Sequence, residues 1–177
     1  MILLDVPYRS QEAQDAKKYG NDCGLACVAM IKQYRTGINM SIDHLAAIRP
    51  PAPFSKTADL VAVGRKIGLR LETTDGSIGR VLSIGRIKSE IQLGNPCILL
   101  VCYERIPDRL NRKYRGGHYI LAVGFDDEQI IVHDPDWWGP LENQGAFRRY
   151  HESVITDAMR GCPGYFSISQ QGVFDWT

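Results

Sequence analysis

The cysteine best suited to chemistry is Cys23, which opens an uncharged run that continues to Ile31. An apolar run of this length, rich in helix formers, is typical of a helix buried on nearly every side. Asn21 or Asp22 can cap its start, and Gly37 can end it. Cys23 then lies in the first turn, where the helix dipole and free backbone N–H groups favour a thiolate. The sequence therefore predicts a nucleophile; the alternative is a buried structural cysteine.

A thiol nucleophile needs a base beside it and a third group that orients the base. His118 is the candidate base, because it begins an apolar strand directly after Gly116 and Gly117. Asp134 is the candidate orienting acid, because it ends the next apolar strand just before Pro135. We therefore expect Cys23, His118 and Asp134 to come together.

The two strands of this pair, residues 117–125 and 129–134, are predicted to form a hairpin across the acidic segment 126–128. In an antiparallel pair, directly opposed residues point to the same face of the sheet, and the face alternates along each strand. The register therefore decides whether His118 and Asp134 share a face. A three-residue turn would pair Phe125 with Gln129, and the acidic triplet favours this length.

That register places Asp134 opposite Ile120, with His118 as a diagonal neighbour ~7–8 Å away between backbones. A two-residue turn would instead bring His133 to the face of His118. The length of the turn thus decides whether the predicted base and acid meet.

The remaining elements are predicted from hydrophobic periodicity and from capping residues. Helices are expected at 41–48, from Ser55 or Thr57 to Gly68, at 84–93 and at 152–160, and strands at 2–6, 69–73, 96–103 and 165–169. Helices precede mostly antiparallel strands, which indicates an α+β fold rather than alternating α/β. We expect a single domain over residues 1–177.

Composition narrows the function classes. The net charge is +1, with 44% hydrophobic and 23% charged residues, which favours neither disorder nor bulk nucleic-acid binding. The start of the chain has no basic leader, and no stretch has the ~18 apolar residues of a membrane span, so a cytoplasmic protein is expected. The five cysteines lack the spacing of a small disulfide framework, and we expect reduced thiols.

A resemblance is carried by four blocks in order: Val6-Pro7-Tyr8-Arg9-Ser10-Gln11, Asp22-Cys23-Gly24-Leu25-Ala26-Cys27-Val28-Ala29-Met30-Ile31, Gly117-His118-Tyr119 and Asp134-Pro135. Together they resemble the C39-like cysteine peptidases, papain-like proteins related to the peptidase domain of bacteriocin-exporting ABC transporters. A weaker similarity links the chain to guanylyl cyclase-like members of the superfamily. The sequence has no glycine-rich phosphate loop or paired metal-binding aspartates, so their name is not carried over as chemistry.

The resemblance implies a papain-like fold with Cys23 as nucleophile, His118 as general base and Asp134 as orienting acid. It also implies a glutamine ahead of the cysteine as oxyanion donor. Gln11 fits the proline-aromatic-x-Ser-Gln pattern and is preferred over Gln14.

Several readings remain open. The triad could transfer an acyl group to an amine rather than to water, or the fold could bind peptides without turnover. Cys23, Cys27, His118 and His133 could be imagined as zinc ligands, but their spacing is poor for zinc, and we expect no metal or cofactor. The expected partner is a peptide or protein substrate, contacted by Gly117 and by Trp137; the alternative is that the rings of Trp137 and Trp138 cap the core.

Overall fold

The computed structural model describes residues 1–12, 22–51, 55–74, 82–161 and 172–175. Gln14 and the strand expected at 165–169 lie outside these residues. The helices are α1 (Cys23–Thr36), α2 (Ile42–Ile48), α3 (Thr57–Lys66), α4 (Ile84–Gln92) and α5 (Glu152–Met159), with short 3-10 helices η1 (Tyr103–Arg105) and η2 (Gly139–Gly145). The strands are β1 (Ile2–Leu3), β2 (Leu71–Thr74), β3 (Cys97–Cys102), β4 (Gly117–Asp126), β5 (Gln129–His133), β6 (Arg148–His151) and β7 (Gly172–Asp175).

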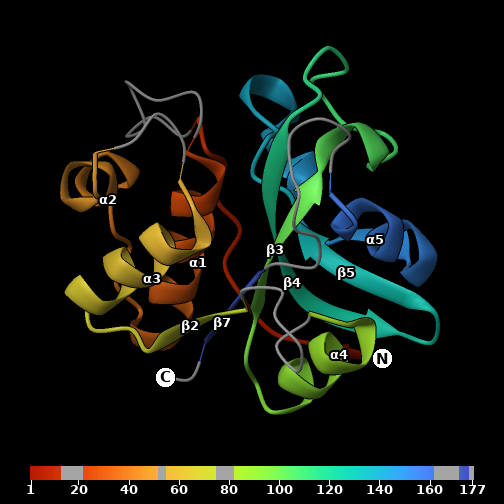
Figure 1. Ribbon diagram of the computed structural model, residues 1–177, viewed down its shortest axis with the longest axis horizontal. Coiled ribbons are helices and arrows are strands. Elements are labelled where there is room, and N and C mark those ends of the chain that lie inside the picture. The colour runs from red at the N-terminus through yellow and green to blue at the C-terminus, as the bar shows by residue number, and fades with distance from the viewer. Residues whose placement is uncertain (13–21, 52–54, 75–81, 162–171, 176–177) are drawn as a thin grey trace.

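All strands belong to one antiparallel sheet in the order β2-β7-β3-β4-β5-β6, with β1 paired to β4. Helices α1, α2 and α3 form one group beside the sheet, and α4 and α5 lie against the sheet away from that group (Figure 1). The predicted α+β class is confirmed, and the apolar run at 97–102 is a central strand as expected. Strands β6 and β7 were not predicted.

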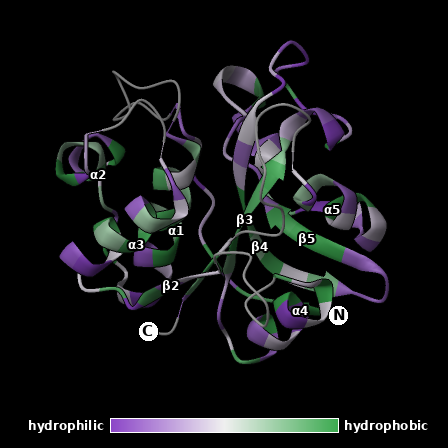
Figure 2. Cartoon of the chain, in the orientation of Figure 1, coloured by the Kyte–Doolittle hydropathy of each residue, from purple (hydrophilic) through white to green (hydrophobic). Residues whose placement is uncertain are grey.

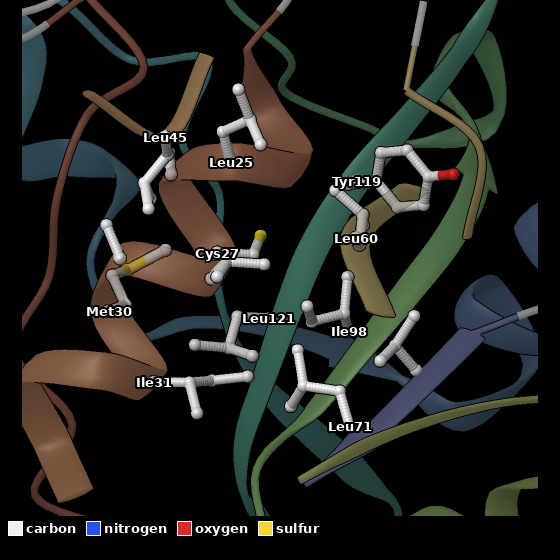
Figure 3. Close-up of a cluster of buried hydrophobic side chains, with 14 of the residues drawn as sticks. Leu25, Cys27, Met30, Ile31, Leu45, Leu60, Leu71, Ile98, Tyr119 and Leu121 are labelled. Carbon is white, nitrogen blue, oxygen red and sulfur yellow. The ribbon is translucent and has the colours of Figure 1, made fainter. Parts of the chain in front are cut away.

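Two hydrophobic cores lie on opposite faces of the sheet, because alternate residues of each strand point to opposite sides. On β4, Tyr119, Leu121 and Val123 join the core under α1 and α3, whereas Ile120 and Ala122 join the core under α4 and α5. Figure 3 shows the first core, where side chains of α1 meet those of the sheet. Colouring by hydropathy shows the apolar strands between helices that carry polar outer faces (Figure 2).

Helix α1 fits its sequence signals closely. Its residues from Gly24 to Lys32 are all buried, as the uncharged run predicts. It ends at Gly37, whose φ of 70° is left-handed and whose N–H donates to Gln33 O. The helix begins at Cys23 and has Asp22 as its N-cap, although the Asp22 side chain makes no capping hydrogen bond. Helix α3 differs from expectation, because Lys56 rather than Ser55 or Thr57 is its N-cap.

The β4–β5 hairpin has a two-residue turn, so the predicted three-residue turn is wrong. Asp126 pairs with Gln129, and Phe125 with Ile130. A β-bulge between Ala122 and Gly124 then shifts the register by one residue. Beyond the bulge, Leu121 pairs with His133.

This register, extended by one residue, places Asp134 opposite Ile120 as expected. The two-residue turn alone would place Asp134 on the face opposite to that of His118, and the bulge returns Asp134 to the same face. His133 remains on the other face.

The cysteines also depart from the expectation in one respect. Cys23, Cys27 and Cys97 are free thiols, whereas Cys102 is disulfide-bonded. The expectation of reduced thiols throughout is therefore wrong for Cys102. Cys97 and Cys102 are both fully buried at the two ends of β3.

Candidate active site

The first turn of α1 is pressed against the sheet, which fixes the position of Cys23. A Cβ added to Gly24 would lie 2.9 Å from Leu60 Cδ2 and 3.0 Å from Tyr119 Cδ2, so glycine permits this close packing. Cys23 itself is only partly buried, unlike the rest of the run that follows it. A thiol at this place is held rigidly and can still be reached.

Strand β4 brings two groups to the thiol. The backbone N–H of Tyr119 donates to Cys23 Sγ at 3.5 Å. His118 is the residue before Tyr119, and it lies close enough to Cys23 for the charge of a thiolate there to raise its pKa. The start of α1 and the start of β4 thus meet at Cys23.

His118 also contacts Asp134, with 2.7 Å between Nε2 and Oδ1. His118 is 3% exposed and Asp134 is fully buried, so water does not compete for this bond. An ionised carboxylate only accepts, so Nε2 carries a proton and Nδ1 is the nitrogen left for Cys23. The ring of Tyr103 covers the imidazole, with 4.5 Å between ring centroids.

Burial disfavours a charged imidazole and by itself lowers the pKa of His118, but the neighbouring groups outweigh it. The Asp134 carboxylate and the Cys23 thiolate, by charge and by hydrogen bonds, raise the pKa of His118 well above its usual value near 6.5. The groups around His118 therefore favour its protonated, imidazolium form.

Asp134 is held by the backbone around it. Its N–H donates to Gly145 O at 2.8 Å, and its carbonyl accepts from the Tyr8 hydroxyl at 3.0 Å. Its Oδ1 also accepts from the N–H of Asp136 at 3.0 Å. A Cβ at Gly145 would collide with Asp134 O and the Tyr8 hydroxyl, so glycine is required there. Tyr8 belongs to the first block of the resemblance, but sequence reasoning gave it no role.

Gln11 lies close to the same loop. Its backbone N–H donates to Pro135 O at 2.9 Å, and its Nε2 donates to Asp136 Oδ1 at 2.8 Å. Gln11 is 5% exposed. Among the described residues, the hydrogen bonds of Gln11 go to this loop rather than to Cys23. The structure thus joins Gln11 to the acid side of the site.

The expected substrate contacts occupy different environments. Gly117 is the partly buried first residue of β4, next to His118. Trp137 is 6% exposed and lies beneath the guanidinium of Arg148, 4.4 Å from the ring centroid. Trp138 is 44% exposed. The ring of Trp137 therefore packs into the protein, and the neighbouring Trp138 presents the open apolar surface.

The zinc reading does not fit the geometry. Both nitrogens of His133 are used, since Nε2 bonds Val6 O at 2.8 Å and Nδ1 accepts from Phe147 N at 3.1 Å. Burial lowers the pKa of His133 to about 4, so this ring is neutral. Across the described parts of the chain, no cluster of three or more His, Cys, Asp or Glu residues could hold a metal ion.

Three solved structures share this fold. A protein described as a C39-like peptidase from Bacillus anthracis superposes with a TM-score of 0.68 and 15% identity, covering 99% of this chain and 97% of that one. The peptidase domain of Streptococcus ComA, a bi-functional ABC transporter of a quorum-sensing pathway, gives 0.58 and 18% over 88% and 90%. A double glycine motif protease from an AMS/PCAT transporter, solved with a leader peptide, gives 0.58 and 14% over 99% and 94%. These likenesses define a papain-like fold of the C39 type.

The sequence itself matches the Peptidase_C39 like family over residues 3–153, and the protein belongs to this family. It is also 27% identical over 119 residues to the sublancin-168-processing and transport ATP-binding protein SunT of Bacillus subtilis strain 168, and equally to that of Bacillus phage SPbeta. The match covers 66% of this chain but 14% of each of those longer proteins. In the described parts of this chain, no helix has the length and apolar character needed to cross a membrane.

Proposed function

We propose that this protein hydrolyses peptide bonds, with Cys23 as nucleophile, His118 as general base and acid, and Asp134 as the group that orients His118. The observation that carries the proposal is the position of His118, which bonds Asp134 and directly precedes Tyr119, whose backbone N–H donates to Cys23 Sγ. A nucleophile whose base is oriented by a third group is the signature of covalent catalysis. Membership of a peptidase family supports the same reaction class.

In the proposed reaction, His118 holds the proton taken from the Cys23 thiol, and the Cys23 sulfur attacks the carbonyl carbon as a thiolate. A C–S bond forms, and the C=O electron pair moves onto oxygen. Collapse of this intermediate breaks the C–N bond, and His118 gives its proton to the leaving amine. Water then attacks the thioester while His118 takes a proton from it. The C–S bond breaks, which releases the acid and leaves the Cys23 thiolate beside the protonated His118.

The oxyanion needs donors that are already in place. The first intrahelical bond of α1 runs from Ala26 N to Asp22 O, so the N–H of Cys23 has no partner within the helix. That backbone N–H is the first proposed donor. The second is the amide nitrogen of Gln11, the residue that the resemblance assigns to this role.

The proposed substrate class is a peptide cut after a double-glycine motif. The support is the similarity to a sublancin-processing protein and to a double glycine motif protease. Trp138, which follows Asp134 by four residues and is exposed, offers an apolar contact for such a peptide.

The test uses two probes: a synthetic leader peptide containing a Gly-Gly pair, and a broad synthetic peptide library read by mass spectrometry. Wild type should cleave one or both, and Cys23→Ala should cleave neither. Cys97→Ala, which removes a buried free thiol of β3, is the matched control and should retain turnover. Absence of any wild-type cleavage would favour the peptide-binding alternative.

A second candidate function is acyl transfer, because the thioester can be attacked by an amine as well as by water. Adding hydroxylamine during turnover should divert part of the product to a hydroxamate. A product made solely by transfer to amines, with no hydrolysis in their absence, would assign the chain to the transferases.

A further inference from the structure

A second carboxylate, Asp136, lies two residues after Asp134 and has no role in the mechanism above. Asp136 is 8% exposed, and its backbone N–H donates to Asp134 Oδ1 at 3.0 Å. Burial raises the pKa of the Asp136 carboxyl, and the charge of the nearby His118 opposes this shift. The Asp136 carboxylate faces Gln11.

Gln11 is fastened to this loop at two points. Its backbone N–H bonds Pro135 O at 2.9 Å, and its Nε2 bonds Asp136 Oδ1 at 2.8 Å. The backbone hydrogen bond fixes the position of Gln11, and the side-chain hydrogen bond fixes the orientation of its amide group. Gln11 Oε1, in contrast, is buried and has no hydrogen-bond partner among the residues that the structure describes.

The orientation of a glutamine amide decides whether it can stabilise an oxyanion, because its nitrogen donates and its oxygen accepts. An ionised carboxylate accepts only, so it attracts the nitrogen and repels the oxygen of the amide. The nitrogen carries two protons, and the bond to Asp136 uses one of them. The second proton stays available to a developing negative charge.

We propose that Asp136 is a positioning residue that holds the Gln11 amide with its donor nitrogen turned to the site. This inference rests on the proposed function, in which Gln11 is an oxyanion donor. It assigns to the Asp-Pro-Asp segment two separate tasks, since Asp134 orients the base and Asp136 orients the oxyanion donor.

The experiment compares Asp136→Ala and Asp136→Asn with wild type, each made also in a Gln11→Ala background. Loss of an oxyanion donor costs about 100- to 1,000-fold in turnover, so Asp136→Ala should lower kcat by at least about 10-fold with little change in KM. Asp136→Asn keeps an acceptor oxygen and should restore part of the loss. In the Gln11→Ala background, Asp136→Ala should cost no further activity. Asp5→Asn removes an exposed carboxylate and is the matched control.

Two measurements do not depend on turnover. Alkylation of Cys23 forms no oxyanion, so its rate should stay near wild type in both Asp136 variants and thereby show that the site is intact. In ¹⁵N spectra, the side-chain amide of Gln11, assigned by its disappearance in Gln11→Ala, should exchange slowly in wild type. Its signals should move in both Asp136 variants and stay unchanged in Asp5→Asn.

An equal loss from Asp136→Ala with and without Gln11 would overturn the proposal, because the carboxylate would then act by another route. Fast exchange of the wild-type Gln11 amide would overturn it as well, and this result needs no variant to fold. If wild type cleaves no peptide, the proposed function fails, and the amide spectra alone decide whether Asp136 sets the orientation of Gln11.

Discussion

His118 Nε2 and Asp134 Oδ1 lie 2.7 Å apart inside the protein, although they come from the beginning of β4 and the residue after β5. The bond depends on the bulge between Ala122 and Gly124, which sets the register of the two strands near the site. It also depends on the backbone bonds that Gly145 and Tyr8 make to Asp134. The geometry of the proposed base is thus built by the hairpin and by the loop that follows it.

Asp134→Asn should lower the pKa of His118. Burial of the ring would remain, but the carboxylate that favours the imidazolium would be lost. The imidazolium should therefore lose its proton at lower pH than in wild type, and turnover should fall by about 100-fold or more. Titration of the His118 ring signals by NMR measures the first effect, with exposed His44 as internal control. An unchanged His118 titration would show that Asp134 does not set its charge.

Cys23 should be the most reactive thiol. It is partly buried beside His118, whereas burial raises the pKa of the Cys27 and Cys97 thiols well above their usual value. Limiting iodoacetamide at neutral pH, followed by peptide mapping, should find the label on Cys23 first. Labelling should slow in His118→Ala, because the imidazolium that favours the thiolate is lost. Faster modification of another cysteine would remove Cys23 as the nucleophile.

Much of the site could be predicted from local sequence. The uncharged run after Cys23 specifies α1, and two apolar strands flanking an acidic turn specify the hairpin of His118 and Asp134. The bulge could not be predicted, because it depends on how both strands pack against the two cores. Strand β7 could not be predicted either, since it pairs with β2 and β3, which are distant in sequence. Pairing with distant strands leaves no pattern in the residues of β7 itself.

Contacts between segments that are distant in sequence could not be predicted either. Gln11 was chosen by resemblance, but its bond to Asp136 joins residues 125 positions apart. Tyr103 covers His118 from a short 3-10 helix after β3, where nothing in the sequence marks it. The Asp-Pro-Asp spacing was the available signal for Asp136, because it places a second carboxylate two residues after the predicted orienting acid.

Gly145→Ala should destabilise the protein and disturb the site together. The added methyl group would collide with Asp134 O and the Tyr8 hydroxyl, and overpacking of this kind costs about 1–3 kcal/mol. Chemical unfolding and Cys23 alkylation measure the two effects. Gly85→Ala at an exposed position of α4 is the control, because the new Cβ would meet Ser83 Oγ at 4.0 Å, an ordinary contact distance. That control should be neutral or stabilising by about 0.5–1 kcal/mol. A rate of Cys23 alkylation in Gly145→Ala equal to that of wild type would show that the loop can move without disturbing the site.

His133 should make the protein less stable as the pH falls. Its pKa is about 4 in the folded state and near 6.5 when unfolded, so the unfolded chain binds the proton first. As the pH falls from 6.5 to about 4, the free energy of unfolding should therefore decrease, and this group contributes up to about 3 kcal/mol of the decrease. His133→Gln cannot bind the proton, so its stability should depend less on pH over this window, whatever its stability at neutral pH. Urea unfolding at several pH values measures the slope, with His44→Gln on the surface as control. Parallel curves for wild type and His133→Gln would mean that the buried ring is already protonated or is hydrated in the folded protein.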